Sequence, residues 1–275
     1  MSRPIITLTT DFGSSDPFVG ILKGVILSIH REVELIDITH NVNSFDLFDG
    51  ALAIASAYSY FPSDTIHLVV VDPGVGSNRR PILATNERYH FIAPDNGILS
   101  GIYERSERLT VRHIDAPHYY RQPVSQTFHG RDIFAPIAAW LSKGVQVTSL
   151  GEEITDFIRF AMPKPKPVDA NTLKGVVMRS DRFGNLLTNI RAEDVAPLFS
   201  ESAPAFKATC GKAEIKRICK SYSEGAQNEP FLIVGSSGYI EISANKTPAN
   251  RLIGADRGAE VTVQLAAPLT AGTTA

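Results

Sequence analysis

The clearest candidate for chemistry in this chain is a carboxylate that directly follows a buried strand. The apolar, β-branched segment 65–71 predicts a strand buried on both faces, and Asp72, a proline, two glycines and Arg79 follow it. In open α/β sheets, ligands bind beyond the carboxyl ends of the strands. A carboxylate and a guanidinium seven positions apart across a glycine-rich turn are therefore placed either for catalysis or for an ordinary loop salt bridge.

Two other polar residues are placed to complete such a site. Asp11 follows the first predicted strand, where a carboxylate can bind both vicinal hydroxyls of a ribose or, alternatively, cap a turn. His129 ends a long polar loop before a helix, where it is either an acid–base group or a cap or surface residue. Gly130 allows a ligand to approach the backbone closely. Asp72, Arg79 and His129 together could orient and polarise a water molecule, with the carboxylate or the imidazole accepting its proton.

One segment in the second half of the chain suits the binding of a purine. Segment 180–185 reads Ser-Asp-Arg-Phe-Gly-Asn and lies between two predicted strands. It brings the aromatic ring of Phe183 beside the amide of Asn185, with Asp181 two residues before the phenylalanine, and such a combination can hold a purine. An ordinary hairpin turn, in which the aspartate and glycine act locally, is the alternative.

A second glycine- and serine-rich turn suits the binding of a carboxylate. The segment 235–241 contains Ser236, Tyr239 and Glu241, and backbone amides and hydroxyls in such a turn can receive an anion. An ordinary turn is again the alternative. Tyr222 lies in a predicted loop and is either a stacking face for a ligand or an edge residue.

An alternating order of strands and helices is expected to position the first set of residues. Apolar runs of strand type and helical spacing alternate through the first half of the chain, which predicts right-handed crossovers and an α/β domain over residues 1–162 with a mainly parallel central sheet. The predicted strands lie at 5–10, 33–38, 65–71, 82–85, 89–93 and 109–114. The predicted helices lie at 18–29, 46–60, 98–103 and 133–141.

A proline-rich segment predicts a domain boundary. Three prolines alternate with lysines after residue 162, which predicts an extended linker over 163–170. Short strands separated by turns then predict a smaller all-β domain over 171–268, an antiparallel sandwich or barrel, followed by a frayed tail over 269–275. The strands of this domain are predicted at 173–178, 185–190, 206–209, 213–218, 231–234, 239–242 and 259–264.

Composition excludes several classes of protein. A length of 275 residues suits two unequal domains, and 43% hydrophobic with 20% charged residues is typical of a globular protein. A net charge of −2, with no massed basic residues, argues against nucleic acid and membrane surfaces as partners. Cys210 and Cys219 lack histidines at zinc spacing, so neither a disulfide framework nor a metal site is expected. Without a signal-like or membrane-spanning segment, the expected location is the cytoplasm.

Six segments together resemble the S-adenosyl-L-methionine hydroxide adenosyltransferase family, the hydrolase relatives of fluorinase and chlorinase. The resemblance extends from about residue 5 to residue 264, and six segments in the family's order are far more specific than any one of them. The segments are Thr10-Asp-Phe-Gly13, Val71-Asp-Pro-Gly-Val-Gly76 with Arg79, Ala93-Pro-Asp-Asn-Gly97, Thr127-Phe-His-Gly-Arg-Asp132, Asp181-Arg-Phe-Gly-Asn185 and Ser236-Ser-Gly-Tyr239.

The resemblance implies a fold, an assembly and a reaction. The family has an N-terminal α/β domain, a C-terminal β-barrel, and homotrimers whose active sites lie between subunits. The implied reaction is a nucleophilic substitution in which water held by Asp72, Arg79 and His129 attacks the ribose C5′ of S-adenosyl-L-methionine. The products are adenosine and L-methionine. The resemblance implies neither a metal nor a separate cofactor, and the expected partner is this small-molecule substrate alone.

The resemblance also implies binding roles. It matches Asp11 to the ribose-binding aspartate of the family and matches Phe183 and Asn185 to positions that face adenine. Asp181 and Ser236 lie near the places that bind the amine and the carboxylate of methionine.

Departures from the halogenases favour water as the nucleophile. The halogenases carry tyrosine at the positions of Asp72 and His129, and fluorinase has a serine at Gly130. A buried carboxylate repels an incoming halide but suits water, which brings a proton that must be removed. The alternatives are a halide-using, chlorinase-like adenosyltransferase, a nucleoside-binding protein without turnover, and a methyltransferase, which the lack of a G-x-G loop after the first strand disfavours.

Overall fold

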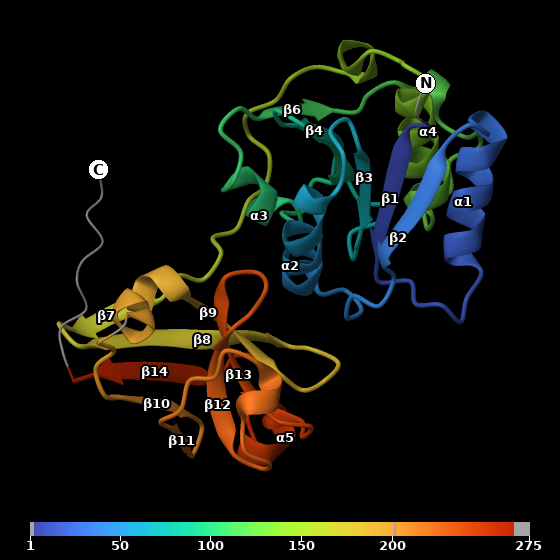
Figure 1. Cartoon of the computed structure of the whole chain (residues 1–275). Coiled ribbons are helices and arrows are strands. Elements are labelled where there is room, and N and C mark those ends of the chain that lie inside the picture. The colour runs from blue at the N-terminus through green and yellow to red at the C-terminus, as the bar shows by residue number, and fades with distance from the viewer. Residues whose placement is uncertain (1–2, 201, 267–275) are drawn as a thin grey trace. The chain divides into compact units, whose positions relative to one another are not determined.

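The computed structural model describes residues 3–200 and 202–266, so the predicted tail over 269–275 lies outside the described residues. The chain divides into two compact units, Met1–Met162 and Pro163–Ala275 (Figure 1). Within the described residues, no helix has the length and apolar character needed to cross a bilayer.

The N-terminal unit contains a six-stranded sheet with the order β2-β1-β3-β5-β4-β6. The strands are β1 (Ile5–Thr10), β2 (Glu34–Thr39), β3 (Ile66–Val70), β4 (Pro81–Thr85), β5 (His90–Pro94) and β6 (Thr110–His113). β2, β1, β3 and β5 pair in parallel, whereas β4 pairs antiparallel with both β5 and β6. The sheet is therefore mixed, because the short turn between β4 and β5 permits only antiparallel pairing.

Helices cover both faces of this sheet. The helices of this unit are α1 (Phe18–Ile29), α2 (Leu47–Ala57), α3 (Ser100–Tyr103) and α4 (Ala135–Ser142). α1 and α4 lie on one face, and α2 and α3 lie on the other (Figure 1). In β3, Leu68 and Val70 enter the core beside α1 and α4, whereas Val69 enters the core beside α2. This alternation confirms the prediction of a strand buried on both faces.

The parallel pairing brings the first two candidate carboxylates to one edge of the sheet. β1 and β3 are neighbours, and their register pairs Thr10 with Val70. Asp11 and Asp72 therefore leave the sheet at the same carboxyl edge. The helix predicted at 133–141 begins earlier than expected, because a π-helical turn, Gly130–Phe134, precedes α4.

The C-terminal unit is an antiparallel sheet that nearly closes into a barrel. Its strand order is β11-β10-β14-β8-β9-β13-β12, and β7 pairs with β8 outside this path. A bridge between Ile218 and Leu232 links β12 to the chain after β11, which almost completes the circle. The strands are β7 (Lys166–Asp169), β8 (Thr172–Ser180), β9 (Leu186–Arg191), β10 (Phe206–Cys210), β11 (Ala213–Ile215), β12 (Pro230–Val234), β13 (Tyr239–Ala244) and β14 (Glu260–Leu265).

β7 and α5 (Ala249–Ile253) are among the elements of this unit that were not predicted from the sequence. β7 lies inside the segment predicted as a linker, where it pairs with β8 and is exposed along its length. Pro167 is compatible with this strand because an edge strand does not need every N–H. The short helix α5 follows Pro248 and ends at Gly254, which has the left-handed conformation common after helices.

Candidate active site

Arg79 joins the two other members of the predicted water-handling set. Its Nε donates to both carboxylate oxygens of Asp72 at 3.0 Å, and its Nη2 donates to Oδ2 as well. The same Nη2 lies 2.7 Å from Nδ1 of His129. The side chains of Asp72 and Arg79 are only 6% and 8% exposed, so the ion pair is shielded from solvent. The structure therefore brings together three residues that are distant in sequence.

This geometry fixes the protonation state of the imidazole. A guanidinium has no lone pair to offer and can only donate, so Nδ1 of His129 must accept and the proton of the neutral ring lies on Nε2. Burial lowers the pKa of His129 below its ordinary value, and the positive charge of Arg79 lowers it further. His129 is therefore a neutral hydrogen-bond donor through Nε2 at neutral pH.

The guanidinium of Arg79 lies behind this set rather than in the cavity. Its carbon Cζ lies 5.1 Å from the ring centroid of Phe134, and its Nη1 is buried without a hydrogen-bond partner among the described residues. Contact with an aromatic face and the hydrogen bonds to Asp72 and His129 hold the group in one orientation. Asp72 and His129 thus keep a fixed relation to each other.

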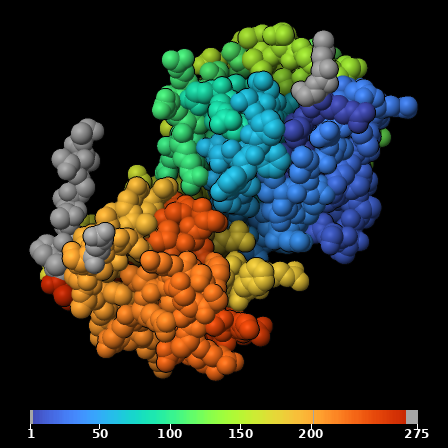
Figure 2. Space-filling view, viewed as in Figure 1, coloured from blue at the N-terminus to red at the C-terminus, as the bar shows by residue number. Residues whose placement is uncertain are grey.

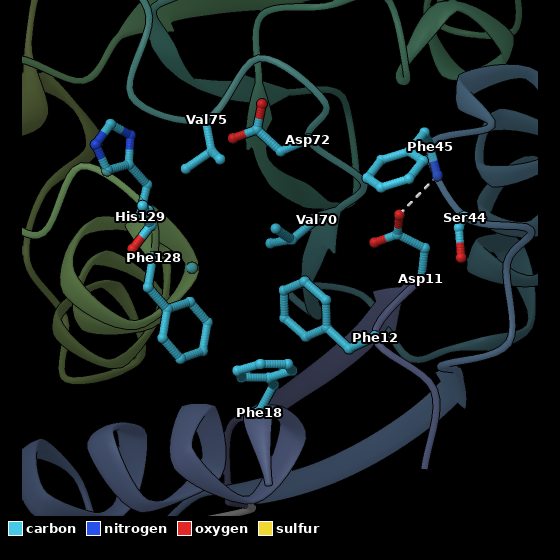
Figure 3. A pocket seen from close by; sticks show the side chains of 12 residues that line it. Asp11, Phe12, Phe18, Ser44, Phe45, Val70, Asp72, Val75, Phe128 and His129 are labelled. Atoms are coloured by element: carbon cyan, nitrogen blue, oxygen red, sulfur yellow. Dashed lines mark hydrogen bonds between the residues drawn. The ribbon is translucent and has the colours of Figure 1, made fainter. Parts of the chain in front are cut away.

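Asp72 and His129 line a cavity of about 270 Å³ in the N-terminal unit (Figure 3). Asp11 and Gly130, two residues predicted to bind substrate, line the same cavity, whereas Arg79 does not. The complete lining consists of Asp11, Phe12, Phe18, Ser44, Phe45, Val70, Asp72, Val75, Thr127, Phe128, His129 and Gly130. The carboxylate, the imidazole and the predicted ribose-binding aspartate therefore face one space.

Asp11 lies across this cavity from His129 and is held by a backbone donor. Its Oδ2 accepts the N–H of Phe45 at 2.9 Å, shown as a dashed line in Figure 3. Phe45 has a positive φ of 65° and a ring that is 72% exposed at the cavity. One carboxylate oxygen is thereby fixed in place, and the group faces the cavity.

Three phenylalanines form an apolar wall that the sequence analysis did not single out. Phe12, Phe18 and Phe128 contact one another edge to face, with ring centroids 5.4 to 6.0 Å apart. Figure 3 shows this group on the side of the cavity away from Asp72. Gly130 adjoins the wall, because a Cβ there would lie 3.3 Å from the Phe128 ring and 3.4 Å from Leu22. Gly130 therefore leaves room that the wall would otherwise lose.

The long loop before His129 is anchored by Asp132, a fully buried carboxylate. Asp132 accepts the N–H of Ser125 at 2.9 Å and pairs with Arg131 and Arg121 at 2.7 and 3.2 Å. Hydrogen bonds from Arg131 and from the Ser125 backbone lower the pKa of Asp132, although burial opposes them. This network holds the chain on both sides of His129.

The residues predicted to bind adenine line a second cavity, within the C-terminal unit. Its volume is about 670 Å³, and its lining consists of Asp181, Arg182, Phe183, Asn185, Tyr222, Ala244, Lys246, Thr247 and Pro248. Phe183 is 78% exposed, and the chain around the β8–β9 turn projects from the surface of this unit in yellow (Figure 2). Asn185 is only 8% exposed.

Asp181 has a local role in the turn that carries these residues. Its Oδ1 accepts the N–H groups of Phe183 and Asn185, and its Oδ2 accepts the side-chain amide of Asn185, each at 2.9 Å. Gly184 has a positive φ of 84°, and a Cβ there would lie 2.6 Å from Pro248. The turn therefore requires both the aspartate and the glycine to present its aromatic ring and amide.

Of the remaining residues predicted to bind substrate, some lie at the second cavity and others line neither cavity. Tyr222 lines the second cavity and donates from its hydroxyl to Glu241 at 3.0 Å. Burial, reinforced by this hydrogen bond, raises the pKa of Tyr222 to about 12, and burial raises the pKa of Glu241. Ser236 and Tyr239 line neither cavity, and Tyr239 instead stacks under the guanidinium of Arg191 at 4.7 Å.

Several residues that line the cavities were not predicted from the sequence. Phe45 and Ser44 lie in the loop after β2. Because β2 ends at the same carboxyl edge of the sheet as β1 and β3, this position could have identified both residues as candidates. Lys246 and Thr247 enter the second cavity from the chain between β13 and α5, which no local pattern indicated. Within residues 3–200 and 202–266, no cluster of three or more His, Cys, Asp or Glu side chains could hold a metal ion.

Comparison with known proteins identifies both units. Residues 6–151 match the SAM hydroxide adenosyltransferase N-terminal domain, and residues 175–262 match the SAM hydroxide adenosyltransferase C-terminal domain. The (R)-S-adenosyl-L-methionine hydrolase of Methanocaldococcus jannaschii is 32% identical to this chain, over 92% of both proteins. The fluorinase of an Actinoplanes species is 26% identical, over 95% of this chain and 97% of the fluorinase.

A solved structure shows the same fold. The crystal structure of an uncharacterized conserved protein from Thermotoga maritima is 32% identical to this chain and superposes with a TM-score of 0.88. The superposition covers 94% of this chain and 99% of that protein.

Proposed function

This chain belongs to the S-adenosyl-L-methionine hydroxide adenosyltransferase family, and we propose that it hydrolyses S-adenosyl-L-methionine by attack of water at the ribose C5′. The products are adenosine and L-methionine. The observation that carries this proposal is the shielded Asp72–Arg79 pair, joined to His129, on the wall of a cavity that also contains Asp11.

The proposed reaction is a single in-line displacement. The water oxygen forms a bond to C5′, and the C5′–S bond breaks with its electron pair moving to sulfur. The sulfonium thereby becomes a neutral thioether, so the leaving group needs no acid and the reaction needs no metal or separate cofactor. The enzyme's contribution is to position the water, exclude bulk solvent and remove one proton.

Asp72 is the proposed acceptor of that proton. Nδ1 of His129 accepts from Arg79, so the imidazole has only its Nε2–H free and acts as a donor to the water oxygen rather than as a base. Arg79 fixes the position of the carboxylate relative to the imidazole through its hydrogen bonds to both. In this arrangement His129 orients the water, and the proton passes directly to the carboxylate.

The proposed binding roles follow the sequence analysis, with one refinement. Asp11 binds the ribose hydroxyls, and Phe183 and Asn185 face the adenine. Asp181 shapes the turn that presents these two residues and keeps a lone pair on Oδ2 for the methionine ammonium. Ser236 lies near the methionine carboxylate.

We also propose that the chain acts as a homotrimer with active sites at the subunit interfaces, as the family resemblance implied. Supporting this, the cavity with Asp72 and His129 offers aromatic rings and carboxylates but no amide side chain for adenine, whereas a separate cavity contains Asn185. Mixing Asp72→Asn and Asn185→Ala subunits after dissociation should restore activity to some sites. No recovery, with mixed trimers demonstrated by mass spectrometry, would contradict shared sites.

The hydrolase relatives are named for the (R) epimer at sulfur, and the proposed substrate of this chain is that same epimer. The two epimers differ only in the direction of the methyl group and the lone pair on sulfur. Incubation with the mixed epimers, followed by chiral chromatography of the remaining substrate, should show faster loss of the (R) form.

The reaction itself is tested with oxygen-18 water. The purified protein is incubated with S-adenosyl-L-methionine, and the products are followed by mass spectrometry, with Asp72→Asn as the matched inactive control. Label in the 5′-hydroxyl of adenosine is the expected result. Formation of 5′-chloro-5′-deoxyadenosine in chloride would instead indicate a halide-using adenosyltransferase, and S-adenosylhomocysteine would indicate methyl transfer. Binding without any product would indicate a nucleoside-binding protein.

A further inference from the structure

The segment Ala93-Pro-Asp-Asn-Gly97, which ends β5 and forms the turn after it, contacts both ends of the loop that carries Asp72 and Arg79, although none of its residues lines either cavity. Nδ2 of Asn96 donates to the carbonyl oxygen of Val71 at 2.9 Å. Val71 immediately precedes Asp72, so this bond holds the backbone where the loop begins.

The other end of the loop is held by Asp95. Its Oδ2 accepts from Nε and Nη2 of Arg80 at 3.0 and 2.7 Å, and its backbone N–H donates to the carbonyl of Arg80 at 2.8 Å. Arg80 immediately follows Arg79, so these bonds hold the backbone where the loop ends. Asp95 is only 2% exposed, which shields the pair from solvent.

Between these two ends, the rest of the unit also supports the loop: the backbone at Gly76 packs against the carbonyl of Gln126, and the side chain of Arg79 contacts His129 and Phe134. Pro73, Gly76, Ser77 and Asn78 are nevertheless exposed, and the backbone hydrogen bonds within the loop close short-range turns, such as that from Val75 N–H to the Asp72 carbonyl. A loop that is exposed over much of its length depends in part on its ends for a fixed conformation. The backbone positions of Asp72 and Arg79 therefore depend on how the ends are held, while the ion pair joins their side chains directly.

We infer that Asp95 and Asn96 are positioning residues that clamp the two ends of loop 72–79 and thereby fix the Asp72–Arg79 pair for the reaction. They act through the backbone of Val71 and through Arg80 and touch no reacting atom. This inference rests on the proposed hydrolysis, because that reaction is what gives the clamp a catalytic consequence.

Asn96→Asp is the decisive variant. An aspartate retains the size of the side chain and the oxygen that accepts the Ile98 N–H at 3.1 Å, but it cannot donate to the Val71 carbonyl. We expect kcat to fall about 10- to 100-fold, since displacement of a catalytic group by about 1 Å has an effect of that size. Adenosine binding should change by less than about 3-fold, because Asp11 and the aromatic wall are untouched. Asn96→Ala should behave in the same way.

Two control variants distinguish loss of the clamp from a general loss of stability in the N-terminal unit. Tyr89→Phe removes the hydroxyl of a buried side chain that donates to the Phe61 carbonyl at 2.8 Å, and Asp156→Asn removes the charge of the exposed partner of Arg80. Both leave the contacts of Asn96 with Val71 and of Asp95 with Arg80 in place. Both should therefore retain the wild-type kcat, even where the melting temperature falls.

Hydrogen exchange provides a readout that does not depend on turnover. In Asn96→Asp, the amides of Val75 and Ser77 should exchange faster than in the wild type, whereas in Tyr89→Phe the exchange of these two amides should not change. Faster exchange with reduced kcat and unchanged adenosine binding supports the clamp. A kcat within 2-fold of wild type, or equal losses in kcat and binding, overturns it. If the wild type itself shows no hydrolysis, the proposed function fails, while the exchange rates still decide whether the clamp exists.

Discussion

Replacing Asp72 by asparagine tests the proposed proton acceptor with the smallest change in shape. The side chain keeps its size and one oxygen, but it loses the negative charge and replaces the second oxygen with an NH₂ group. That NH₂ group would face either Nε or Nη2 of Arg79, both of which are donors. The variant therefore lacks the base, and its NH₂ group and Arg79 face each other as two donors with no acceptor between them.

The expected magnitudes follow from the burial of the pair. Arg79 is 8% exposed and its Nη1 already has no partner, so loss of the carboxylate leaves a shielded cation largely uncompensated. Removing one partner of a buried ion pair costs about 3–5 kcal/mol, and we expect about 3 kcal/mol because asparagine retains one acceptor. At about 2–4 °C per kcal/mol, the melting temperature of the N-terminal unit should fall by roughly 6–12 °C. Loss of a general base should lower kcat by about 10²- to 10⁴-fold.

The assay combines single-turnover kinetics, adenosine binding and calorimetry, all below the melting temperature of the variant. Asp156→Asn is the matched control, because it makes the same acid-to-amide change beside an arginine but at a residue that is 76% exposed. It should retain the wild-type rate. A kcat for Asp72→Asn within 10-fold of wild type, measured on folded protein, would refute the role of Asp72 as proton acceptor.

Three other predictions follow from the geometry. Burial and Arg79 lower the pKa of His129, so the neutral donor should persist as the pH falls through 6.5, and kcat/KM should decline only at more acidic pH. A decline centred at or above pH 6.5 in the pH–rate profile would contradict this. Asp11→Ala should weaken adenosine binding more than it lowers kcat, because the carboxylate held by the Phe45 N–H is the proposed ribose ligand; calorimetry giving an unchanged Kd would count against it. Burial lowers the pKa of His67 to about 3, so the unfolded state binds more protons between pH 6.5 and about 3, and stability should fall by about 2 kcal/mol from pH 7.5 to pH 5. His67→Gln should remove that part of the pH dependence in urea unfolding, and an identical dependence in both proteins would show that His67 does not cause it.

The local sequence pattern was sufficient to predict the strands and helices that position the residues of the first cavity. The helical spacing over 18–29 and the alternating strand over 5–10 agree with α1 and β1 at both ends. The buried strand before Asp72 was recognisable because each face of β3 contacts a different core. Because ligands bind beyond the carboxyl ends of the strands in such sheets, Asp11 and Asp72 could be predicted to lie at the same edge.

Features that depend on long-range pairing were not predictable from local pattern. The mixed character of the sheet depends on β4 inserting between β5 and β6, which hydrophobic pattern does not encode. β7 was expected to be a linker because its proline and lysines are typical of one, yet an edge position tolerates both. The local bonds of Asp181 were likewise hidden, because the sequence cannot show whether a carboxylate faces its own turn or a ligand.

The direction in which Arg79 donates also bears on the choice between water and halide. Its cation lies behind the cavity lining and directs its hydrogen bonds to Asp72 and His129, so an anion in the cavity would meet the carboxylate first. At a separation of about 4 Å and an effective dielectric constant of about 20, the carboxylate alone would repel a halide by about 4 kcal/mol, equivalent to about 10³ in affinity, and the more distant cation of Arg79 offsets part of this repulsion. Water carries no such penalty and can give its proton to that same carboxylate. With a neutral imidazole, the charges of Asp72, Arg79 and His129 sum to zero and the carboxylate is the charge that lines the cavity, so the electrostatic difference favours hydrolysis over halide transfer.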